Sequence, residues 1–302
     1  VAYSDLVSGE SIYGMPLYVD TLALYYNRAM LSGAGVATPP KLWTEFQEAV
    51  KKITTYDQSR NIIRSGAALG TAANINRSTD IVMSLMLQSG VRMTDDDRTE
   101  ATFSQTVDNQ PVGETALAFY VDFANPQKQV YSWNDTQDNN IDAFASGKTA
   151  MILNYSHQAE VIREKAPRLE FGVAQIPQIT AGDVRTYANY WPLTVGKGSQ
   201  YPYQAWQFVH YMTAGEGAGF YIAATGRPSA RRDIIDQQKN DPIIGVFAQQ
   251  ALSARSWYQV DNLAIETIFA DMIDAINFGR TTIKEALRDA EAKVSVLMQS
   301  RR

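Results

Sequence analysis

Hydrophobic positions follow two different spacings along this chain. Apolar residues recur every three or four positions in three segments, which predicts amphipathic helices over residues 42–53, 265–276 and 283–297. Short apolar runs bounded by glycine, proline or asparagine lie elsewhere, as is typical of buried strands. These runs cover residues 14–19, 22–27, 150–154, 171–176 and 190–195. Strands that alternate with helices predict an α/β fold.

The stretches between these elements carry local signals of their own. Residues 66–76 and 94–109 are polar and rich in turn formers, and we expect surface loops or short irregular strands there. Pro39 and Pro40 predict an extended entry into the helix that runs through Lys52. Gly147 is expected to close a short helix before the strand at 150–154. The residues after that strand should then lie at a carboxyl edge, where open α/β sheets bind ligands.

Length and composition narrow the class of protein. A chain of 302 residues exceeds the size at which one core stops growing, so we expect two lobes. A net charge of -5 lacks the basic excess that nucleic acid or anionic membrane requires. Cysteine is absent, which removes disulfides and thiolate chemistry. The sequence contains no apolar run of the roughly 20 residues that span a bilayer, and its start does not resemble a signal peptide.

Motifs of catalysis and of cofactor binding are missing from the sequence. It contains no Gly-x-Ser-x-Gly, no Gly-x-x-x-x-Gly-Lys-Ser/Thr and no Gly-x-Gly-x-x-Gly. His157 and His210 are its two histidines, which is too few for a zinc site without thiolates. Residues 135–142 offer oxygen ligands but lack the glycine of a calcium loop. We therefore expect no catalytic residue, no metal and no cofactor.

Polar and aromatic side chains that follow strands are the candidates for ligand binding. Asp20 follows the first strand, where a carboxylate can accept hydrogen bonds from neighbouring sugar hydroxyls, and Tyr18 shares its strand face. Asn154, Tyr155 and His157 bring amide, phenol and imidazole groups to the end of another strand. Each of these residues has an alternative role as a turn former or cap. Together they predict a pocket for a hydroxylated ligand.

An ordered series of short motifs resembles the extracellular solute-binding proteins of ATP-binding cassette sugar importers, of the maltose-binding-protein type. The series starts with Tyr13-Gly-x-Pro-x-x-x-Asp20 and Leu24-x-Tyr-Asn27, followed by Pro39-Pro-x-x-Trp-x-Glu-Phe46. It continues with Phe144-x-x-Gly-x-x-Ala-Met151, Ala205-Trp-x-Phe-Val209, Thr225-Gly-Arg-Pro228 and the helix that starts at Thr282. Each motif is weak alone, and their common order over nearly the whole chain carries the resemblance.

The chain departs from the family pattern at three places. Leu42 stands where the family usually has a threonine helix cap, which must then come from elsewhere or be lost. Tyr155-Ser-His157 replaces a Gly-x-Trp whose tryptophan stacks on sugar, so Tyr155 or His157 takes that role here. Family members also begin with βα units ahead of the Tyr-Gly-x-Pro strand. Without those units, we expect the N-terminal lobe to expose an apolar face.

The resemblance implies a periplasmic-binding-protein-like fold of two lobes with a hinge, in which the first lobe lacks its initial βα units in this chain. Residues 1–19 and 190–253 would belong to the N-terminal lobe, and residues 20–189 and 254–302 would form the C-terminal lobe. The chain would cross between lobes near residues 18–21, 187–192 and 254–258. Ligand would bind in the cleft between the lobes, in contact with Tyr190, Trp191, Arg227, Trp257 and Tyr258 as well as the candidates above.

The function implied is that of a receptor that captures a sugar or oligosaccharide and delivers it to the membrane permease. We expect a monomer in the periplasm or outside the cell, free or held by a lipid anchor at its amino terminus. The same fold could bind a polyamine, an anion or a peptide, but the candidate cleft residues are mostly neutral and aromatic. A glycoside hydrolase, which needs two carboxylates flanking a glycosidic bond, is the less favoured alternative.

Overall fold

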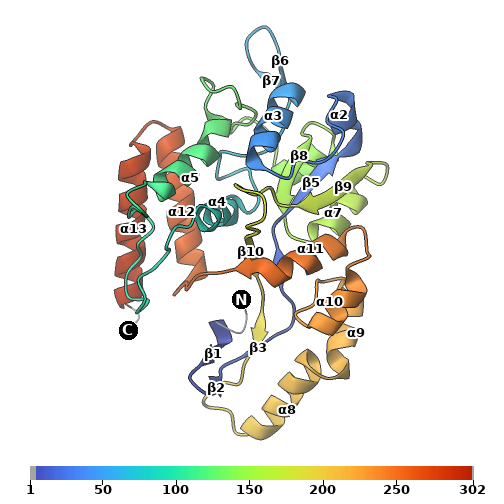
Figure 1. The fold of residues 1–302 in the computed structure, drawn as a ribbon, viewed down its shortest axis with the longest axis vertical. Helices are drawn as coiled ribbons and strands as arrows, with labels where there is room; N and C mark the ends of the chain where they lie inside the picture. The colour runs from blue at the N-terminus through green and yellow to red at the C-terminus, as the bar shows by residue number, and fades with distance from the viewer. Residues whose placement is uncertain (1–4, 301–302) are drawn as a thin grey trace.

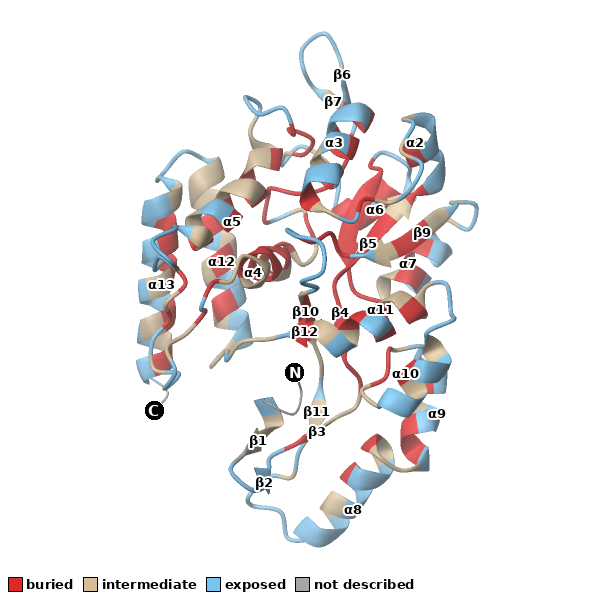
Figure 2. Cartoon of the chain, in the orientation of Figure 1, coloured by how far each residue is buried: buried red, intermediate tan, exposed pale blue. Residues whose placement is uncertain are grey.

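The computed structural model describes residues 5–300, which form a mixed α/β protein with a larger and a smaller part. Figure 1 shows the larger part above, with the long C-terminal helices at its left edge, and the smaller part below around α8 and α9. The main hydrophobic core lies in the larger part, where β5 and α4 are coloured as buried in Figure 2.

The core of the larger part is built around a three-stranded sheet. Strand β5 (Ala23–Asn27) lies between β8 (Met151–Asn154) and β9 (Phe171–Gln175) and is antiparallel to both. These strands agree with the predicted apolar runs to within one residue at each end. Because the pairing is antiparallel, the carboxyl end of β8 lies beside the amino end of β5, with Asn154 opposite Ala23. The residues that follow β8 are thereby placed next to those that precede β5.

A second small sheet joins three segments that lie far apart in the sequence. Its strands are β4 (Asp20–Thr21), β10 (Thr186–Asn189) and β12 (Ala254–Arg255), in the order β12-β10-β4. The three segments predicted to cross between lobes therefore lie side by side. A separate small core of Val19, Ala188 and Ala254 packs between them.

The predicted strands at 14–19 and 190–195 are much shorter in the structure. Only β3 (Met15–Pro16) and β11 (Pro192–Leu193) form, and Pro16 pairs with Pro192. Proline has no N–H to donate, so two facing prolines interrupt the ladder. The prediction of longer strands was wrong for this reason, and the main strand of the second segment is β10.

Helices pack against the strands and against one another. In the larger part, α5 packs on α4 and α13, and α12 packs on α13. The side-chain cap at Leu42 is lost, and Glu45 in the first turn of α3 accepts bonds from the N–H groups of Lys41 and Leu42 that precede the helix. The helices of the larger part are α2 (Arg28–Gly33), α3 (Trp43–Ile53), α4 (Ser78–Gln88), α5 (Val112–Val121), α6 (Asn140–Ala145), α7 (Gln158–Lys165), α11 (Ile244–Gln250), α12 (Asn262–Asn277) and α13 (Ile283–Ser300).

The smaller part leaves several large apolar side chains exposed to solvent. It consists of β1 (Val7–Ser8), β2 (Ser11–Ile12), β3, β11, α8 (Pro202–Thr213), α9 (Glu216–Thr225) and α10 (Arg232–Gln238). Tyr203, Phe208 and Phe220 on α8 and α9 are exposed, so an apolar surface is present here. Helix α11, which the predicted boundary at 253 assigns to this lobe, packs against α10 as well as against β9 and β4.

One predicted surface loop proved to be buried. Residues 66–76 contain no regular helix or strand, as expected, but Ala67, Ala68 and Leu69 belong to the main core. Small side chains allow this segment to pass beneath the helices. Its backbone is satisfied by bonds such as that from the Ala68 N–H to the Met151 carbonyl. The remaining short elements are β6 (Thr55–Tyr56), β7 (Ile62–Arg64) and the 3-10 turns η1 (Asp122–Ala124) and η2 (Ala251–Ser253).

Candidate functional site

The structure brings nearly all the predicted residues to one cleft of about 1170 Å³ beside the second small sheet. Its walls come from β4, β10, the loop after β8, the start of α4, the turn after α9 and the segment after β12. The predicted residues that line it are Tyr18, Asp20, Tyr155, His157, Tyr190, Trp191, Arg227, Trp257 and Tyr258. Segments from across the sequence thus converge on one site.

Asn154 is the predicted residue that lies behind the cleft wall. Its side chain is fully buried and donates to Asn76 Oδ1 at 3.0 Å. Its own Oδ1 accepts from the N–H of Tyr155 at 2.8 Å. In this structure Asn154 therefore holds the turn that presents Tyr155 and His157.

Asp20 is held tightly by other protein groups. Its carboxylate is 1% exposed and accepts bonds from the Ser156 hydroxyl (2.7 Å), the Ser156 N–H (3.1 Å) and the Thr21 N–H (2.9 Å). Burial raises the pKa of Asp20 to about 6, although these bonds and Arg227 favour the charged form. The antiparallel β5–β8 pairing is what places Ser156 beside Asp20. Asp20 therefore joins β4 to the loop after β8.

Arg227 connects Asp20 with His157 and Tyr18. Gly226 ends α9 in the left-handed region (φ 61°), and Arg227 follows it into the cleft. Its Nη1 atom lies 3.4 Å from Asp20 Oδ2 and 3.2 Å from His157 Nδ1, and its guanidinium covers the Tyr18 ring at 5.1 Å. Arginine donates only, so His157 Nδ1 must be an unprotonated acceptor.

The imidazole of His157 is consequently neutral. Burial, followed by Arg227 and Arg77, lowers the pKa of His157 to about 4. The ring proton then resides on Nε2, which lies 3.1 Å from the amide nitrogen of Gln158. Turning that amide over would present Gln158 Oε1, which is otherwise buried without a hydrogen-bond partner. His157 thus offers its ring edge and face to the cleft.

A second polar cluster was missed by sequence reasoning. The hydroxyl of Tyr155 donates to Asp80 Oδ2 at 2.7 Å, and the guanidinium of Arg77 lies 5.8 Å from the Tyr155 ring. Arg77 has φ 67°, which is uncommon for a residue other than glycine, and its Nε is buried without a partner. Burial raises the pKa of Asp80 to about 6. The one sequence signal here was an acidic residue near the start of a helix.

Aromatic side chains also line the cleft. Trp191 is 67% exposed and Tyr258 is 44% exposed, so both present ring faces to solvent. The guanidinium of Arg98 lies 5.8 Å from the Tyr258 ring. Tyr190 and Trp257 are partly buried, and the Tyr190 hydroxyl donates to Asp5. Exposed ring faces of this kind can stack on an apolar ligand surface.

The cleft is more charged than the residues chosen from sequence indicate. Five carboxylates and four guanidinium groups line it, so the two signs nearly balance. They are Asp5, Asp20, Asp80, Asp96, Glu266, Arg77, Arg92, Arg98 and Arg227. The expectation of a mostly neutral site missed this because most of these residues lie in segments that showed no periodic pattern.

Rising pH is expected to lower the free energy of unfolding between about pH 4 and pH 6 through Asp20 and Asp80. Their folded pKa of about 6 exceeds the ordinary 3.8, so their stabilising contribution is present at low pH and lost as pH rises. His157 has the opposite sign, because its contribution is lost as pH falls from 6.5 to about 4.

Asp80→Asn tests this directly. Removing the buried charge should raise the free energy of unfolding by about 1–3 kcal/mol at neutral pH, with little change near pH 4. Urea unfolding followed by circular dichroism at both pH values would measure the difference. An equal change in the free energy of unfolding at both pH values would contradict the titration assigned to Asp80.

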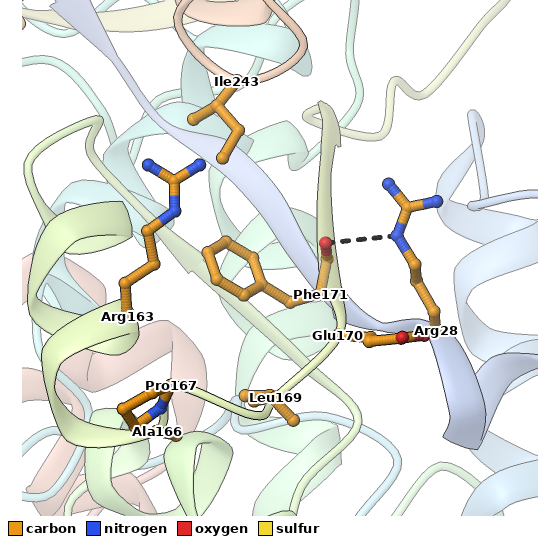
Figure 3. Close-up of a pocket in the computed structure, with 8 residues that line it drawn as sticks. All are labelled: Arg28, Arg163, Ala166, Pro167, Leu169, Glu170, Phe171 and Ile243. Atoms are coloured by element: carbon orange, nitrogen blue, oxygen red, sulfur yellow. Dashed lines mark hydrogen bonds between the residues drawn. The ribbon is translucent and has the colours of Figure 1, made fainter.

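A second pocket of about 640 Å³ lies on the outside of the sheet. Figure 3 shows Arg163 and Arg28 on either side of Phe171, whose carbonyl accepts a bond from Arg28 Nε at 3.2 Å. Its charged residues Arg28, Arg163 and Glu170 are exposed, and none of the predicted site residues lines it. The cleft at the second sheet is therefore the better candidate site.

Sequence comparison finds relatives that are named as binding proteins. A binding protein of Brucella abortus (strain 2308) is 22% identical over 309 residues, which cover 98% of this chain and 70% of that protein. The maltodextrin-binding protein MdxE of Bacillus subtilis (strain 168) is 27% identical over 256 residues, which cover 79% of this chain and 55% of that protein.

Solved structures show the same fold. A cyclo/maltodextrin-binding protein complexed with maltotetraose superposes with a TM-score of 0.81 at 19% identity, and the match covers 100% of this chain and 74% of that one. The likeness confirms the predicted two-lobed α/β fold. Within residues 5–300, every helix is too short or too polar to cross a bilayer.

A family model also matches most of the chain. The model described as "Bacterial extracellular solute-binding protein" matches residues 2–245. The match confirms the resemblance carried by the ordered motifs. This chain belongs to the bacterial extracellular solute-binding protein family.

Proposed function

We propose that this protein captures a sugar or short oligosaccharide in the cleft and delivers it to the permease of an ATP-binding cassette importer, without making or breaking a bond. The observation that carries the proposal is the composition of the cleft. The exposed aromatic rings of Trp191 and Tyr258 line the cleft together with the hydrogen-bonding groups of Arg77, Arg227 and His157. A sugar ring has the same division between an apolar face and a hydroxyl-bearing edge.

Closure about a hinge is the proposed mechanism of capture. The three segments that meet in the β12-β10-β4 sheet are short, and each can absorb a rotation of one lobe relative to the other. The smaller lobe comprises residues 1–19 and 190–253 in this proposal. Ligand stabilises the closed form by contacting both lobes at once, and the population shift is set by its differential affinity.

Two roles in the site follow from burial. Trp191 and Tyr258 stack on ring faces because their rings are exposed. Asp20 is enclosed by Ser156, Thr21 and Arg227, so it fixes the position of Arg227, which in turn meets the ligand. From the sequence alone, Asp20 was expected to contact the sugar hydroxyls directly. Direct contact is the alternative role of Asp20 in the closed form.

The proposal places the protein as a monomer in the periplasm or at the cell surface, with no nucleic-acid partner and no cofactor. The Bacillus subtilis relative is a maltodextrin-binding protein, and the solved structure is complexed with maltotetraose. These two ligands make α-linked glucose oligomers the first candidates. The balanced charges of the cleft argue against a polyamine or a simple anion, because either would meet repulsion as well as attraction.

Isothermal titration calorimetry of the purified chain would test the function. The panel comprises maltose, maltotetraose, mannobiose and glucose, with spermidine, sulfate and a tripeptide as the non-sugar arm. We expect saturable heat with at least one sugar and none with the non-sugar solutes. Binding of spermidine, sulfate or the tripeptide in preference to every sugar would replace the proposed ligand class.

A further inference from the structure

Three hydrogen-bond donors converge on the sulfur of Met83 in the cleft wall. The Trp257 indole Nε1 and the Tyr187 hydroxyl each lie 3.4 Å from Sδ, and Gln259 Nε2 lies 3.6 Å from it. Gln259 Nε2 also donates to the Tyr187 hydroxyl oxygen at 2.7 Å. All four residues line the cleft.

Met83 connects three separate parts of the fold. It lies on α4 and is 1% exposed, whereas Tyr187 belongs to β10 and Trp257 and Gln259 follow β12. Two of the three crossing segments are thus tied to one helix of the larger part. The Trp257 ring is packed from another side by Phe269, with centroids 6.4 Å apart. Its orientation is therefore set by one apolar neighbour and by the sulfur.

The acceptor property of the thioether matters here more than its volume. Sulfur is a weak acceptor, but both the Tyr187 hydroxyl and the Trp257 indole donate to it, and the Trp257 indole also faces the Tyr187 hydroxyl oxygen. Leucine would fill similar space while removing the sulfur acceptor of both donors, and the loss is costly for the buried Tyr187 hydroxyl in particular. Met86 provides the contrast, because it is fully buried on the same helix and receives no hydrogen bond from the described residues.

We propose that Met83 is a positioning residue whose sulfur orients the Trp257 indole and the Tyr187 phenol in the wall of the ligand cleft. The ligand part of this inference rests on the proposed function, whereas the positioning part does not. If the sulfur acceptor is lost, Trp257 and Tyr187 turn toward other acceptors, and the cleft presents its aromatic face less well to a sugar.

The indole N–H resonances of the tryptophans in ¹⁵N-labelled protein give a readout that packing alone would not move. Met83→Leu should shift the Trp257 resonance and speed its exchange with solvent. Trp43 and Trp133 serve as internal references, because their indoles donate to the amide oxygens of Gln88 and Asn74. Trp257→Phe assigns the resonance, and Met86→Leu is the matched core control, expected to leave Trp257 in place.

Selenomethionine labelling supplies a second test that keeps the fold. Exchanging sulfur for selenium changes the acceptor of Trp257 and leaves the oxygen acceptors of Trp43 and Trp133 unaltered. A Trp257 resonance that stays in place in both the selenomethionine protein and Met83→Leu would overturn the proposal. A shift equally large in Met86→Leu would overturn it as well.

Affinity is the final readout. For a sugar that binds in the calorimetric panel, Met83→Leu should weaken binding about three- to tenfold, as expected for one lost hydrogen bond, while Met86→Leu should not. An unchanged affinity in Met83→Leu would overturn the ligand part of the inference. If no sugar binds the unmodified protein, the proposed function fails, and the indole resonances still decide the positioning role.

Discussion

Asp20→Ala is expected to lower the free energy of unfolding by about 2–4 kcal/mol. The substitution removes the acceptor of two buried backbone N–H groups, those of Thr21 and Ser156, and of the Ser156 hydroxyl. Leaving a buried donor without a partner costs about 1–3 kcal/mol for each group. Arg227 contributes less to this loss, because its side chain is 27% exposed and regains water.

The matched variant Asp20→Asn separates hydrogen bonding from charge. Asparagine keeps an oxygen for the two N–H groups while removing the charge that Arg227 faces. We therefore expect it to lose less than half of what Asp20→Ala loses. Urea unfolding at neutral pH would measure both variants. Equal losses in the two would mean that the ion pair with Arg227, and not the pair of N–H bonds, stabilises this corner of the cleft.

Trp191→Ala is expected to weaken sugar binding by about 1–3 kcal/mol, or about 5- to 150-fold in the dissociation constant, with little change in stability. An aromatic anchor contributes this much when its face stacks on a ligand. Stability should hold because the side chain is 67% exposed and packs little in the free protein. Calorimetry with a sugar that binds in the panel would give the change in affinity.

Two further variants control this experiment. Trp191→Phe keeps a smaller aromatic face and should recover part of the affinity. Tyr203→Ala removes an equally exposed aromatic ring, 71% accessible, from α8 outside the cleft, and should leave the dissociation constant unchanged. An unchanged affinity in Trp191→Ala at unaltered stability would remove Trp191 from the site.

Local pattern was enough to predict most elements of the larger part. The strands β5, β8 and β9 and the helices α3, α12 and α13 were all expected, because each buries one face or one apolar run that is visible over a few residues. Where a residue type opposed the pattern, the prediction failed. Pro16 and Pro192 shortened β3 and β11, and small residues let the segment 66–76 pass into the core.

Some residues of the candidate site could be predicted from sequence and others could not. Strand ends and the family resemblance predicted the candidates, and the structure brings these nine to one cleft: Tyr18, Asp20, Tyr155, His157, Tyr190, Trp191, Arg227, Trp257 and Tyr258. Arg77, Asp80 and Met83 were not among them. The placement of Arg77 in the cleft depends on its left-handed backbone conformation. The contacts of Asp80 and Met83 are with residues about 75 to 176 positions away along the chain.

The sequence alone determined the family, the α/β class and the aromatic and polar character of the cleft, because these reside in residue types, short spacings and motif order. Only the tertiary structure decided which side chains are free to meet a ligand. Asp20 looked available from sequence, yet the antiparallel β5–β8 pairing brings Ser156 onto its carboxylate. Trp191 remained exposed because nothing in residues 5–300 packs over its ring. Burial and hydrogen-bond partners are set by contacts between distant segments, which local sequence does not encode.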